Sequence, residues 1–406
     1  MTKTDSQTLQ VKDLPVYPPR DKAIDDHAYM KQVMRLGPLV RDGYFGVHTF
    51  SHQHMLDMLS DDLTRQLETE GIDLLGIGAG AIRDFFANVM LFSNGTVHRN
   101  RRAPLARAFA FPIVKAMRAD IRAAATAIIK PLLGGGEVDF LADVAGPMPA
   151  RIIAGILGVP ERDIPHFTTL VYSSIRVLAS RSRGILLEAE ADLARLNTYV
   201  AGVLADRAKS PQQDFLSAYL ARVADSALDP TEVRVQIVGL ILAGSDTTRS
   251  SIATTFARLL DHQDQWEMFK ADPDALKADV TAEGLRYDPV VGSLSRIAAQ
   301  DFMLAGVRIP TGSVLFMSMI AALRDPAIYA DPDRFNITRK DHPALHPAFG
   351  GGGHRCLGEA LARVEIEETL SVLAELAPNA RLIGPVPTLR GLTGVRGING
   401  MTVALG

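Results

Sequence analysis

Ten residues near the C-terminus combine conformational freedom with a reactive side chain. The stretch 349–358 reads Phe-Gly-Gly-Gly-Gly-His-Arg-Cys-Leu-Gly, and its cysteine, Cys356, is the only one in the chain. Glycines let a backbone take left-handed conformations and let a bulky group lie against it. A helical pattern begins at Glu359, directly after the stretch, and the positive end of a helix favours a thiolate. The stretch therefore predicts either a metal ligand or a nucleophile.

Taken alone, the stretch allows more than one interpretation. A flexible hinge that carries a buried, unreactive cysteine also fits these residues. A phosphate-binding loop does not, because no Gly-Lys-Ser/Thr follows the glycines and their spacing does not give G-x-G-x-x-G. The whole stretch matches the pattern F-G-x-G-x-H-x-C-x-G. With this long pattern the chain resembles the haem-thiolate monooxygenases, the cytochrome P450 family.

The resemblance implies a haem b group bound at this loop. In that family the cysteine sulfur is the axial ligand of haem iron, which corresponds to Cys356, and the histidine two residues earlier, His354, contacts a haem propionate. The thiolate pushes electron density toward iron and favours O–O cleavage, and hydrogen bonds to the sulfur tune this effect. The candidate donors of those bonds are the amides of Leu357 and Gly358. The other haem contacts implied in the loop are Phe349 and Gly350.

A second group of basic residues has the spacing of an anion-binding site. His98 and Arg102 are four residues apart, and the segment 99–111 has a helical pattern, so both side chains are expected on one helix face. In the resembled family a pair at this place contacts the haem propionates, and Arg296 matches a further propionate contact. The family's usual acidic-Pro-Pro lead-in is replaced here by Ser-Asn-Gly-Thr at 93–96. This departure puts the local turn in question more than the two contacts.

The strongest helix signal is Asp-Pro-Thr-Glu at 229–232, which supplies an N-cap, a proline in the first turn and a capping-box glutamate. Apolar periodicity continues from there to about residue 260. The pattern also fits one helix that ends at Gly244 and a second one capped by Asp246 or Thr247. In the resembled family an A-G-x-D/E-T/S element here opens beside the haem and delivers protons during oxygen activation. The corresponding haem contacts are Ala243 and Gly244, and the corresponding catalytic acid and alcohol are Asp246 and Thr247.

Glu283 and Arg286 form the only Glu-x-x-Arg in the chain. By itself the pair fits a surface contact worth about 0.2–0.5 kcal/mol. In the resembled family the pair is buried and is completed by the arginine of a Pro-Glu-Arg-Phe segment, which reads Pro-Asp-Arg-Phe at 332–335 here and points to Arg334. Such a network has a structural role, because it holds the cysteine loop against the haem.

Several apolar segments are candidates for the substrate cavity. The segment between residues 70 and 88 mixes glycines with apolar side chains, so it either packs under the domain or lines a cavity. In the resembled family the loop at this place covers the substrate, and the segment 287–294 runs along the cavity. Core packing explains each of these residues equally well. The candidate substrate contacts are Ile82, Phe85, Phe86, Gly239, Leu242, Val290, Gly292, Leu294 and Val395.

Composition indicates one large globular domain. The chain has 406 residues, 47% of them hydrophobic and 22% charged, and no linker, repeat or low-complexity tract divides it. We expect a polar tail over 1–25 and one domain over 26–406, and the resemblance implies the cytochrome P450 fold, mainly α with a minor β region. A net charge of −3 does not favour nucleic acid. A single cysteine and the lack of an apolar span indicate a cytoplasmic protein that does not enter a membrane, and we expect a monomer.

Coarser patterns complete the expected architecture. Helical spacing begins around Asp26, recurs over 53–67 and continues through most of 118–207. Strands are expected within 302–309 and 314–317, and the tail over 381–405 has the pattern of hairpins.

The electrons are expected to come from another protein. The chain has no flavin or nicotinamide fingerprint and too few cysteines for an iron–sulfur cluster. Resemblance to soluble bacterial P450s implies an acidic ferredoxin with its own reductase. A basic patch beside the thiolate would steer such a partner, although a run of charges is usually only a solvated face. The arginines of this candidate patch are Arg99, Arg101, Arg102, Arg107 and Arg355.

The resemblance implies insertion of one oxygen atom of O₂ into a C–H bond of a largely apolar small molecule. A peroxide-driven peroxygenase and a haem-based sensor are the first two alternatives. The pair Asp246 and Thr247 argues against both, because neither function needs a proton relay. A Cys/His hydrolase is a third alternative, but no assigned feature makes an oxyanion hole.

Overall fold

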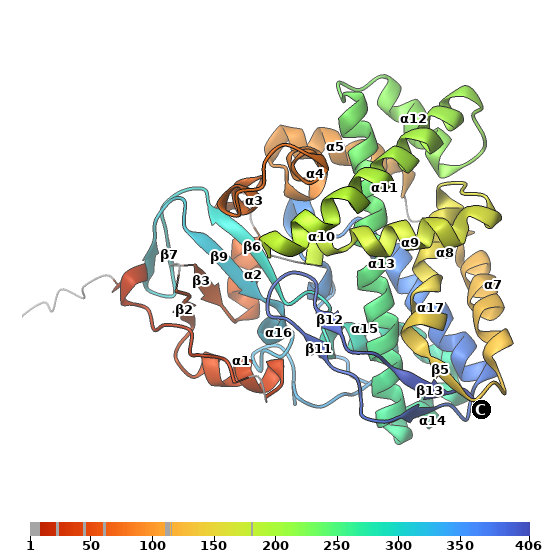
Figure 1. Ribbon diagram of the computed structural model, residues 1–406. Helices are drawn as coiled ribbons and strands as arrows, with labels where there is room; N and C mark the ends of the chain where they lie inside the picture. Colours follow the sequence, from red (N-terminus) through yellow and green to blue (C-terminus); the bar gives the residue numbers. More distant parts are fainter. Residues whose placement is uncertain are drawn as a thin grey trace, which may run out of the picture.

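The computed structural model describes residues 9–21, 24–43, 46–59, 62–109, 114, 116–179 and 182–406 of the chain. Helices form most of the molecule, and the largest sheet lies to one side of them beside α1 and α2 (Figure 1). The α-helices of the described residues are α1 (Asp26–Met34), α2 (His52–Met58), α3 (Glu70–Leu74), α4 (Ala81–Asn88), α5 (Gly95–Ala108), α7 (Arg118–Ile129), α8 (Pro147–Ile156), α9 (Ile164–Ser174), α10 (Arg176–Ala179), α11 (Arg183–Lys209), α12 (Phe215–Ala224), α13 (Pro230–Asp261), α14 (Gln263–Ala271), α15 (Pro273–Tyr287), α16 (Met319–Ala322) and α17 (Glu359–Leu376).

Strands of the described residues form one sheet of five strands and three smaller sheets. The five-stranded sheet has the order β2-β3-β9-β6-β4, the two three-stranded sheets have the orders β1-β8-β7 and β10-β13-β5, and β11 pairs with β12. The strands are β1 (Leu9–Gln10), β2 (Leu39–Arg41), β3 (Val47–Thr49), β4 (Thr64–Arg65), β5 (Glu137–Asp139), β6 (Ser293–Ala298), β7 (Phe302–Leu304), β8 (Val307–Ile309), β9 (Val314–Ser318), β10 (Arg381–Ile383), β11 (Leu389–Arg390), β12 (Gly397–Ile398) and β13 (Thr402–Ala404).

Helix α13 is one continuous helix of 32 residues, which makes it about 48 Å long at about 1.5 Å per residue. Its start is the predicted capping box: Asp229 accepts from the Glu232 amide at 2.8 Å, and the Asp229 amide donates to the Glu232 side chain at 3.1 Å. The helix continues through Gly244, so the alternative of two separate helices is wrong. No described helix, α13 included, is long and apolar enough to cross a membrane.

Two apolar clusters share α13. Val235 and Ile241, in its first half, pack with residues of α4, α9 and α11. Ile252 and Phe256, in its second half, pack with residues of α7, α15 and α17. Each of the four is at most 1% exposed. The small and polar residues at 243–247 therefore lie where the helix passes from one cluster to the other.

Two local predictions need correction. The helix expected over 53–67 ends at Met58, and Thr64–Arg65 form β4, which pairs with β6 in the sheet. The stretch 70–88, expected as a glycine-rich loop, contains α3 and α4, and only the turn between them is a loop. In both segments hydrogen bonds to a distant partner decide the structure: β6 pairs with β4, and Glu190 of α11 accepts from the first amides of α4.

Residues 9–21, which the sequence analysis assigns to a tail, are held against the sheet. Leu9–Gln10 pair in parallel with β8, and Val16 forms a bridge with Arg41. Leu14 belongs to the apolar cluster beneath the sheet and is 8% exposed.

The Glu-x-x-Arg pair is fully buried, as the resemblance implies. Arg286 donates to both carboxylate oxygens of Glu283 at 2.6 and 2.8 Å. The prediction that the Arg334 side chain completes this network is wrong, because Arg334 is exposed and offers its carbonyl to Arg286 at 3.0 Å. The third guanidinium is that of Arg339, which is 4% exposed and 3.3 Å from the Glu283 carboxylate. An arginine four residues after Phe335 is the signal that the sequence analysis missed.

Candidate functional site

The cysteine loop is a tight turn in which two positions require glycine. Gly350 and Gly352 have φ values of 67° and 61°, in the left-handed region that side chains rarely adopt. A Cβ on Gly352 would also lie 2.3 Å from the carbonyl oxygen of Leu59. The amide of Cys356 donates to the carbonyl of Phe349 at 2.9 Å and closes the loop. The glycines thus press the loop against α2 and fix where the cysteine sits.

The Cys356 thiol is accessible although protein surrounds it. The residue is exposed, while burial raises the pKa of its thiol. The amide of Gly358 donates to the sulfur, and the charges of Arg102 and Arg355 favour the thiolate, so these groups oppose the effect of burial. Leu357 packs against both apolar clusters. A sulfur that is reachable, held in place and hydrogen-bonded suits a metal ligand, because a coordinated cation removes the thiol proton outright.

Four basic side chains gather beside this loop. The rings of His98 and His354 stack, with centroids 3.8 Å apart. Arg102 donates to the carbonyl of Arg355 at 2.6 Å and so ties α5 to the cysteine loop. Burial, together with the charges of His98, Arg296 and Arg102, lowers the pKa of His354 to about 3. We call His98, Arg102, Arg296 and His354 the cationic cluster; because its pKa is low, the His354 ring is neutral near pH 7, and the permanent charges are those of Arg102 and Arg296.

The cationic cluster fits a cofactor that carries carboxylates. The charged groups that shift the pKa of His354 are all cationic. His98 and Arg296 are 4% and 6% exposed, so water screens them little. A carboxylate among these groups would receive charge-assisted hydrogen bonds. Together with the accessible thiol, this donor set fits an iron porphyrin with its propionates.

Asp246 and Thr247 lie where α13 passes between the two apolar clusters. Asp246 is 6% exposed, and its carboxylate accepts from the guanidinium of Arg249 one turn later. The hydroxyl of Thr247 donates to the carbonyl of Ala243 at 2.8 Å and remains accessible. Ala243 is exposed and Gly244 is half-buried. An accessible alcohol therefore stands beside a buried, ion-paired acid. Arg249, three residues after the acid, is a partner that the sequence analysis did not consider.

Most predicted substrate contacts belong to the core. Ile82 and Phe85 have no exposed surface, so a ligand has no access to them in this conformation. A Cβ on Gly239 would lie 2.6 Å from a methyl of Val89; this glycine lets α13 pack against the end of α4. The structure thus assigns these positions to core packing, the alternative that the pattern left open. The buried candidates are Ile82, Phe85, Phe86, Gly239, Leu242, Val290 and Gly292.

The other two candidates, Leu294 and Val395, keep accessible surface. Leu294 is half-buried, and its side chain is 3.8 Å from the position that a Cβ on Gly350 would take. Val395 is half-buried and forms an isolated bridge with Val291, which is also half-buried. The accessible valine of this segment is therefore Val291, where the sequence analysis named Val290.

Arg101 does not belong to an exposed basic patch. It is 6% exposed, forms an ion pair with Glu232 at 2.8 Å and donates to the carbonyl of Ala87 at 3.0 Å. These contacts join α5 to α4 and to the first turn of α13, so Arg101 has a structural role. Arg99 and Arg107 on the same helix are exposed.

Comparison with known proteins decides the family. Residues 193–374 match the family model for cytochrome P450. Over 366 residues the chain is 39% identical to plant-inducible cytochrome P450-pinF1 of Rhizobium radiobacter, and the match covers 90% of this chain and 86% of that protein. The chain belongs to the cytochrome P450 family. A luteothin monooxygenase of Streptomyces thioluteus is 32% identical over 338 residues, 82% of each chain. The P450 is therefore an oxidoreductase of the monooxygenase class.

Solved structures share the same fold. The crystal structure of CalO2 superposes with a TM-score of 0.86 at 26% identity and covers 96% of this chain and 99% of that one. P450BioI, solved in complex with an acyl carrier protein that bears hexadec-9Z-enoic acid, superposes with a TM-score of 0.83 at 26% identity, over 93% and 97% of the two chains. The expected P450 fold is confirmed, and membership of the family implies a haem.

Proposed function

We propose that this P450 inserts one atom of O₂ into a C–H bond of a largely apolar small molecule. The observation that carries the proposal is the accessible Cys356 thiol beside the cationic cluster, with Asp246 and Thr247 on α13, the helix shared by the two apolar clusters that Leu357 contacts. Leu294, which lies beside Gly350 of the cysteine loop, is apolar and half-buried, and so is Val395. One relative, 29% identical over 76% of the chain, is named a steroid C26-monooxygenase, a name that indicates a large apolar substrate for that protein.

The chain's own residues would hold the cofactor by charge and by coordination. Cys356 would supply a thiolate ligand to the haem iron, and the cationic cluster would bind the propionates. When bound, a haem with a thiolate ligand supplies the activation of dioxygen. The glycine loop and the bond from Arg102 to the carbonyl of Arg355 keep the sulfur and the cluster at a fixed separation.

Thr247 and Asp246 would move the protons that oxygen activation consumes. The Thr247 hydroxyl carries one donor and two acceptor sites, and its bond to the carbonyl of Ala243 uses the donor while leaving the oxygen able to accept. The carboxylate of Asp246 is held in place by the guanidinium of Arg249. We propose that Asp246 relays protons to Thr247, and that Thr247 presents them to the oxygen substrate.

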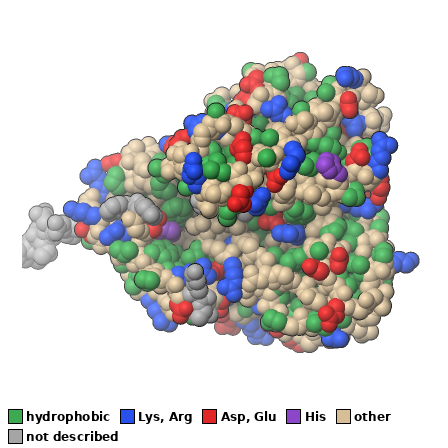
Figure 2. Space-filling view, viewed as in Figure 1, with side chains coloured by type: hydrophobic (Ala, Val, Ile, Leu, Met, Phe, Trp, Pro, Cys, Tyr) green, Lys and Arg blue, Asp and Glu red, His purple; other side chains and the backbone are tan. Residues whose placement is uncertain are grey.

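We further propose that a small acidic ferredoxin and its reductase supply the electrons. Helix α5 contains four arginines and no acidic residue, whereas basic and acidic side chains are interspersed on the face shown in Figure 2. Arg99 and Arg107 are exposed. Val97 and Leu345, 50% and 67% exposed, add apolar surface on α5 and just before the cysteine loop. In keeping with such a partner, we place the protein in the cytoplasm as a monomer.

Charge reversal tests this docking face. Arg99→Glu and Arg107→Glu should slow reduction by an acidic ferredoxin, and rising salt should slow reduction of the parent protein, without a change in substrate affinity. Arg162→Glu is the matched control, because Arg162 is an exposed arginine outside α5 and the cysteine loop. Parent rates in the α5 variants, or reduction that is independent of salt, would place the partner elsewhere.

Isotope incorporation tests the reaction itself. The holoenzyme should be supplied with a reductase, a [2Fe–2S] ferredoxin and ligands chosen by a spin-state shift of the haem spectrum. We expect one labelled oxygen atom from labelled O₂ in the product. Label that comes only from peroxide, with no product from O₂ and reductant, would favour a peroxygenase. Reversible ligand binding without any product would favour a sensor.

A further inference from the structure

Arg296 of the cationic cluster has a neutral partner from another part of the chain. It donates from Nη1 to the side-chain oxygen of Gln66 at 2.9 Å, and both residues are buried, 6% and 7% exposed. Arg296 lies on β6, and Gln66 directly follows β4, the neighbouring strand of the five-stranded sheet. A neutral acceptor orients a guanidinium without cancelling its charge, so this contact preserves the attraction for an anion.

Gln66 is in turn held by Asn94. The amide of Gln66 donates to Asn94 Oδ1 at 2.7 Å, and Asn94 Nδ2 donates to the carbonyl of Gln66 at 3.3 Å. Asn94 Nδ2 also donates to Glu68 at 2.9 Å. This reciprocal pair fixes the backbone of Gln66 as an adjacent strand would, although Asn94 belongs to the lead-in of α5 and not to the sheet.

Asn94 also begins the helix that carries the other side of the cluster. Its carbonyl accepts from the amide of His98 at 3.1 Å, the first bond of α5. Its side chain makes no capping bond to that helix and is therefore committed to Gln66 and Glu68. One residue thus connects His98 on α5 with Arg296 on β6, through Gln66.

We propose that Gln66 and Asn94 form a clamp that sets the position of Arg296 relative to His98 and so tunes how the cationic cluster grips an anionic cofactor. Gln66 and Asn94 are positioning residues, because they act through Arg296 and the start of α5. Asn94 belongs to the Ser-Asn-Gly-Thr lead-in at 93–96, where this chain departs from the acidic-Pro-Pro that is usual in the family. The clamp therefore assigns a role to that departure. The proposal rests on the proposed function, since the anion is taken to be the haem propionates.

Two measurements on the holoenzyme test the clamp: the rate of haem transfer to excess apomyoglobin, and the haem midpoint potential. Gln66→Met removes the acceptor while keeping the length of the side chain, and should speed haem transfer about tenfold, as expected for loss of a hydrogen bond to a charged group. Gln66→Glu places a carboxylate on Arg296, so it should shift the potential to more negative values than Gln66→Met does. Asn94→Ala should also speed haem transfer, as Gln66→Met does.

Gln265→Met is the matched control. Gln265 is also buried, donates to the carbonyl of Phe335 at 2.8 Å and accepts from the amide of Ile337 at 2.9 Å, but it lies on α14. Gln265→Met should lower the melting temperature without changing the rate of haem transfer or the haem midpoint potential. The clamp is wrong if Gln66→Met changes these two quantities no more than Gln265→Met does.

A double-mutant cycle shows whether Gln66 acts through Arg296. In an Arg296→Leu background, Gln66→Met should add nothing to the rate of haem transfer. Additive effects would assign Gln66 a merely structural role. If the parent protein holds no haem through a thiolate, the proposed function has failed first; a normally loaded parent with unresponsive Gln66 variants refutes the clamp alone.

Discussion

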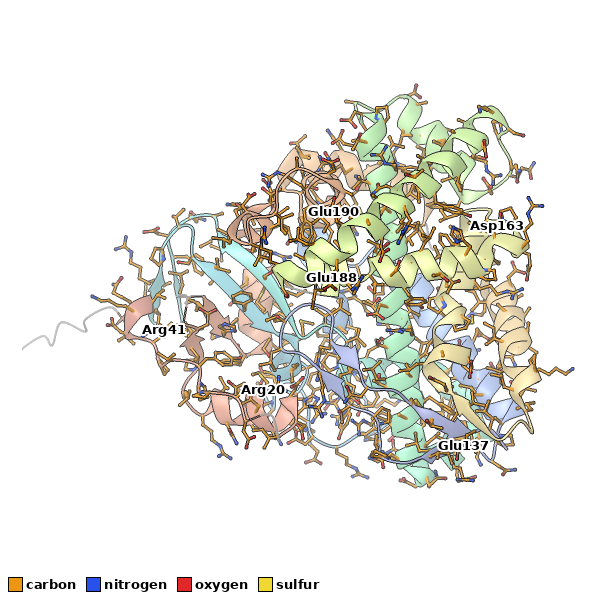
Figure 3. The ribbon with its side chains drawn as sticks, viewed as in Figure 1. Arg20, Arg41, Glu137, Asp163, Glu188 and Glu190 are labelled. Carbon is orange, nitrogen blue, oxygen red and sulfur yellow. The ribbon has the colours of Figure 1, made fainter. Side chains whose placement is uncertain are left out.

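The side of the molecule around Cys356 and the side around α4 are built by different means. On the side of Cys356, hydrogen bonds and charges fix the positions: Arg102 holds the cysteine loop, and Gln66 holds Arg296. On the side of α4, apolar packing dominates, with Phe85 fully buried. Polar contacts hold the two ends of α4: the carboxylate of Glu190 accepts from its first two amides, the Ile82 amide at 3.2 Å (Figure 3), and Arg101 donates to the carbonyl of Ala87 near its last turn.

Because hydrogen bonds dominate around Cys356 and apolar packing dominates around α4, we expect the two sides to have different functions. Directional hydrogen bonds specify one geometry and tolerate little change, which suits a group that is the same in every catalytic cycle. Apolar packing is non-directional and tolerates repacking when volume is kept. This suits a region, here α4 and its neighbours, that rearranges to admit a substrate. We therefore expect substitutions near Cys356 to change the cofactor and those around α4 to change access.

The largest expected effect is that of Cys356→Ser. A serine hydroxyl does not readily supply a soft anionic ligand, so the variant should lose substrate turnover and the thiolate spectrum together. Activity and the ferric absorption spectrum should be compared with the parent at equal haem content. Retained turnover with a normal spectrum would remove Cys356 from the site.

The buried network behind the loop should be the next most sensitive region. Arg339→Leu leaves Glu283, which is 0% exposed, without one of its partners, and breaking such a buried pair costs about 3–5 kcal/mol. Arg334→Leu keeps the carbonyl that the network uses and should change stability by less than about 0.5 kcal/mol. Urea unfolding of both variants measures the difference. An equal loss in the free energy of unfolding in the two variants would show that the Arg334 side chain belongs to the network of Glu283 and Arg286.

The proton relay predicts a loss of coupling with binding intact. Thr247→Ala should bind substrate normally but release hydrogen peroxide in place of product, and the yield of product per NADPH should fall at least tenfold. Thr248→Ala is the control, because Thr248 is a neighbouring threonine that is 4% exposed. Asp246→Asn should slow turnover, because it removes the carboxylate that supplies protons to Thr247. Parent-like coupling in Thr247→Ala contradicts the relay.

The smallest effect is expected at α4. Glu190→Ala removes the acceptor of the first amides of α4, a contact comparable to an N-cap and worth about 1 kcal/mol. Amide exchange at Ala81 and Ile82 should become about fivefold faster, and substrate should associate faster, with the haem spectrum unchanged. Glu188→Ala, on the same helix, removes a pairing with Arg176 at 3.3 Å and is the control. An altered haem spectrum in Glu190→Ala would erase the distinction between the two sides.

The sequence predicted those features that depend on local chemistry. The capping box of α13 and the glycine loop before Cys356 are contiguous patterns, and the structure contains both. Burial of Ile82 and Phe85 could not be predicted, because an apolar residue fits a core and a cavity equally well. The Pro-Asp-Arg-Phe pattern pointed to Arg334 and gave no reason to consider Arg339, because a pattern does not show which residue turns its side chain inward. Gln66 has no charge or spacing signal, and its partner lies 230 positions away in the chain.

We propose that Cys356 ligates haem iron as a thiolate while the cationic cluster holds the propionates. The absorption spectrum of the reduced holoenzyme under carbon monoxide tests the ligation most directly. We predict a strongly red-shifted Soret band, the signature of thiolate ligation. A well-folded, haem-loaded protein whose reduced carbon monoxide complex lacks that shift would rule out thiolate ligation by Cys356.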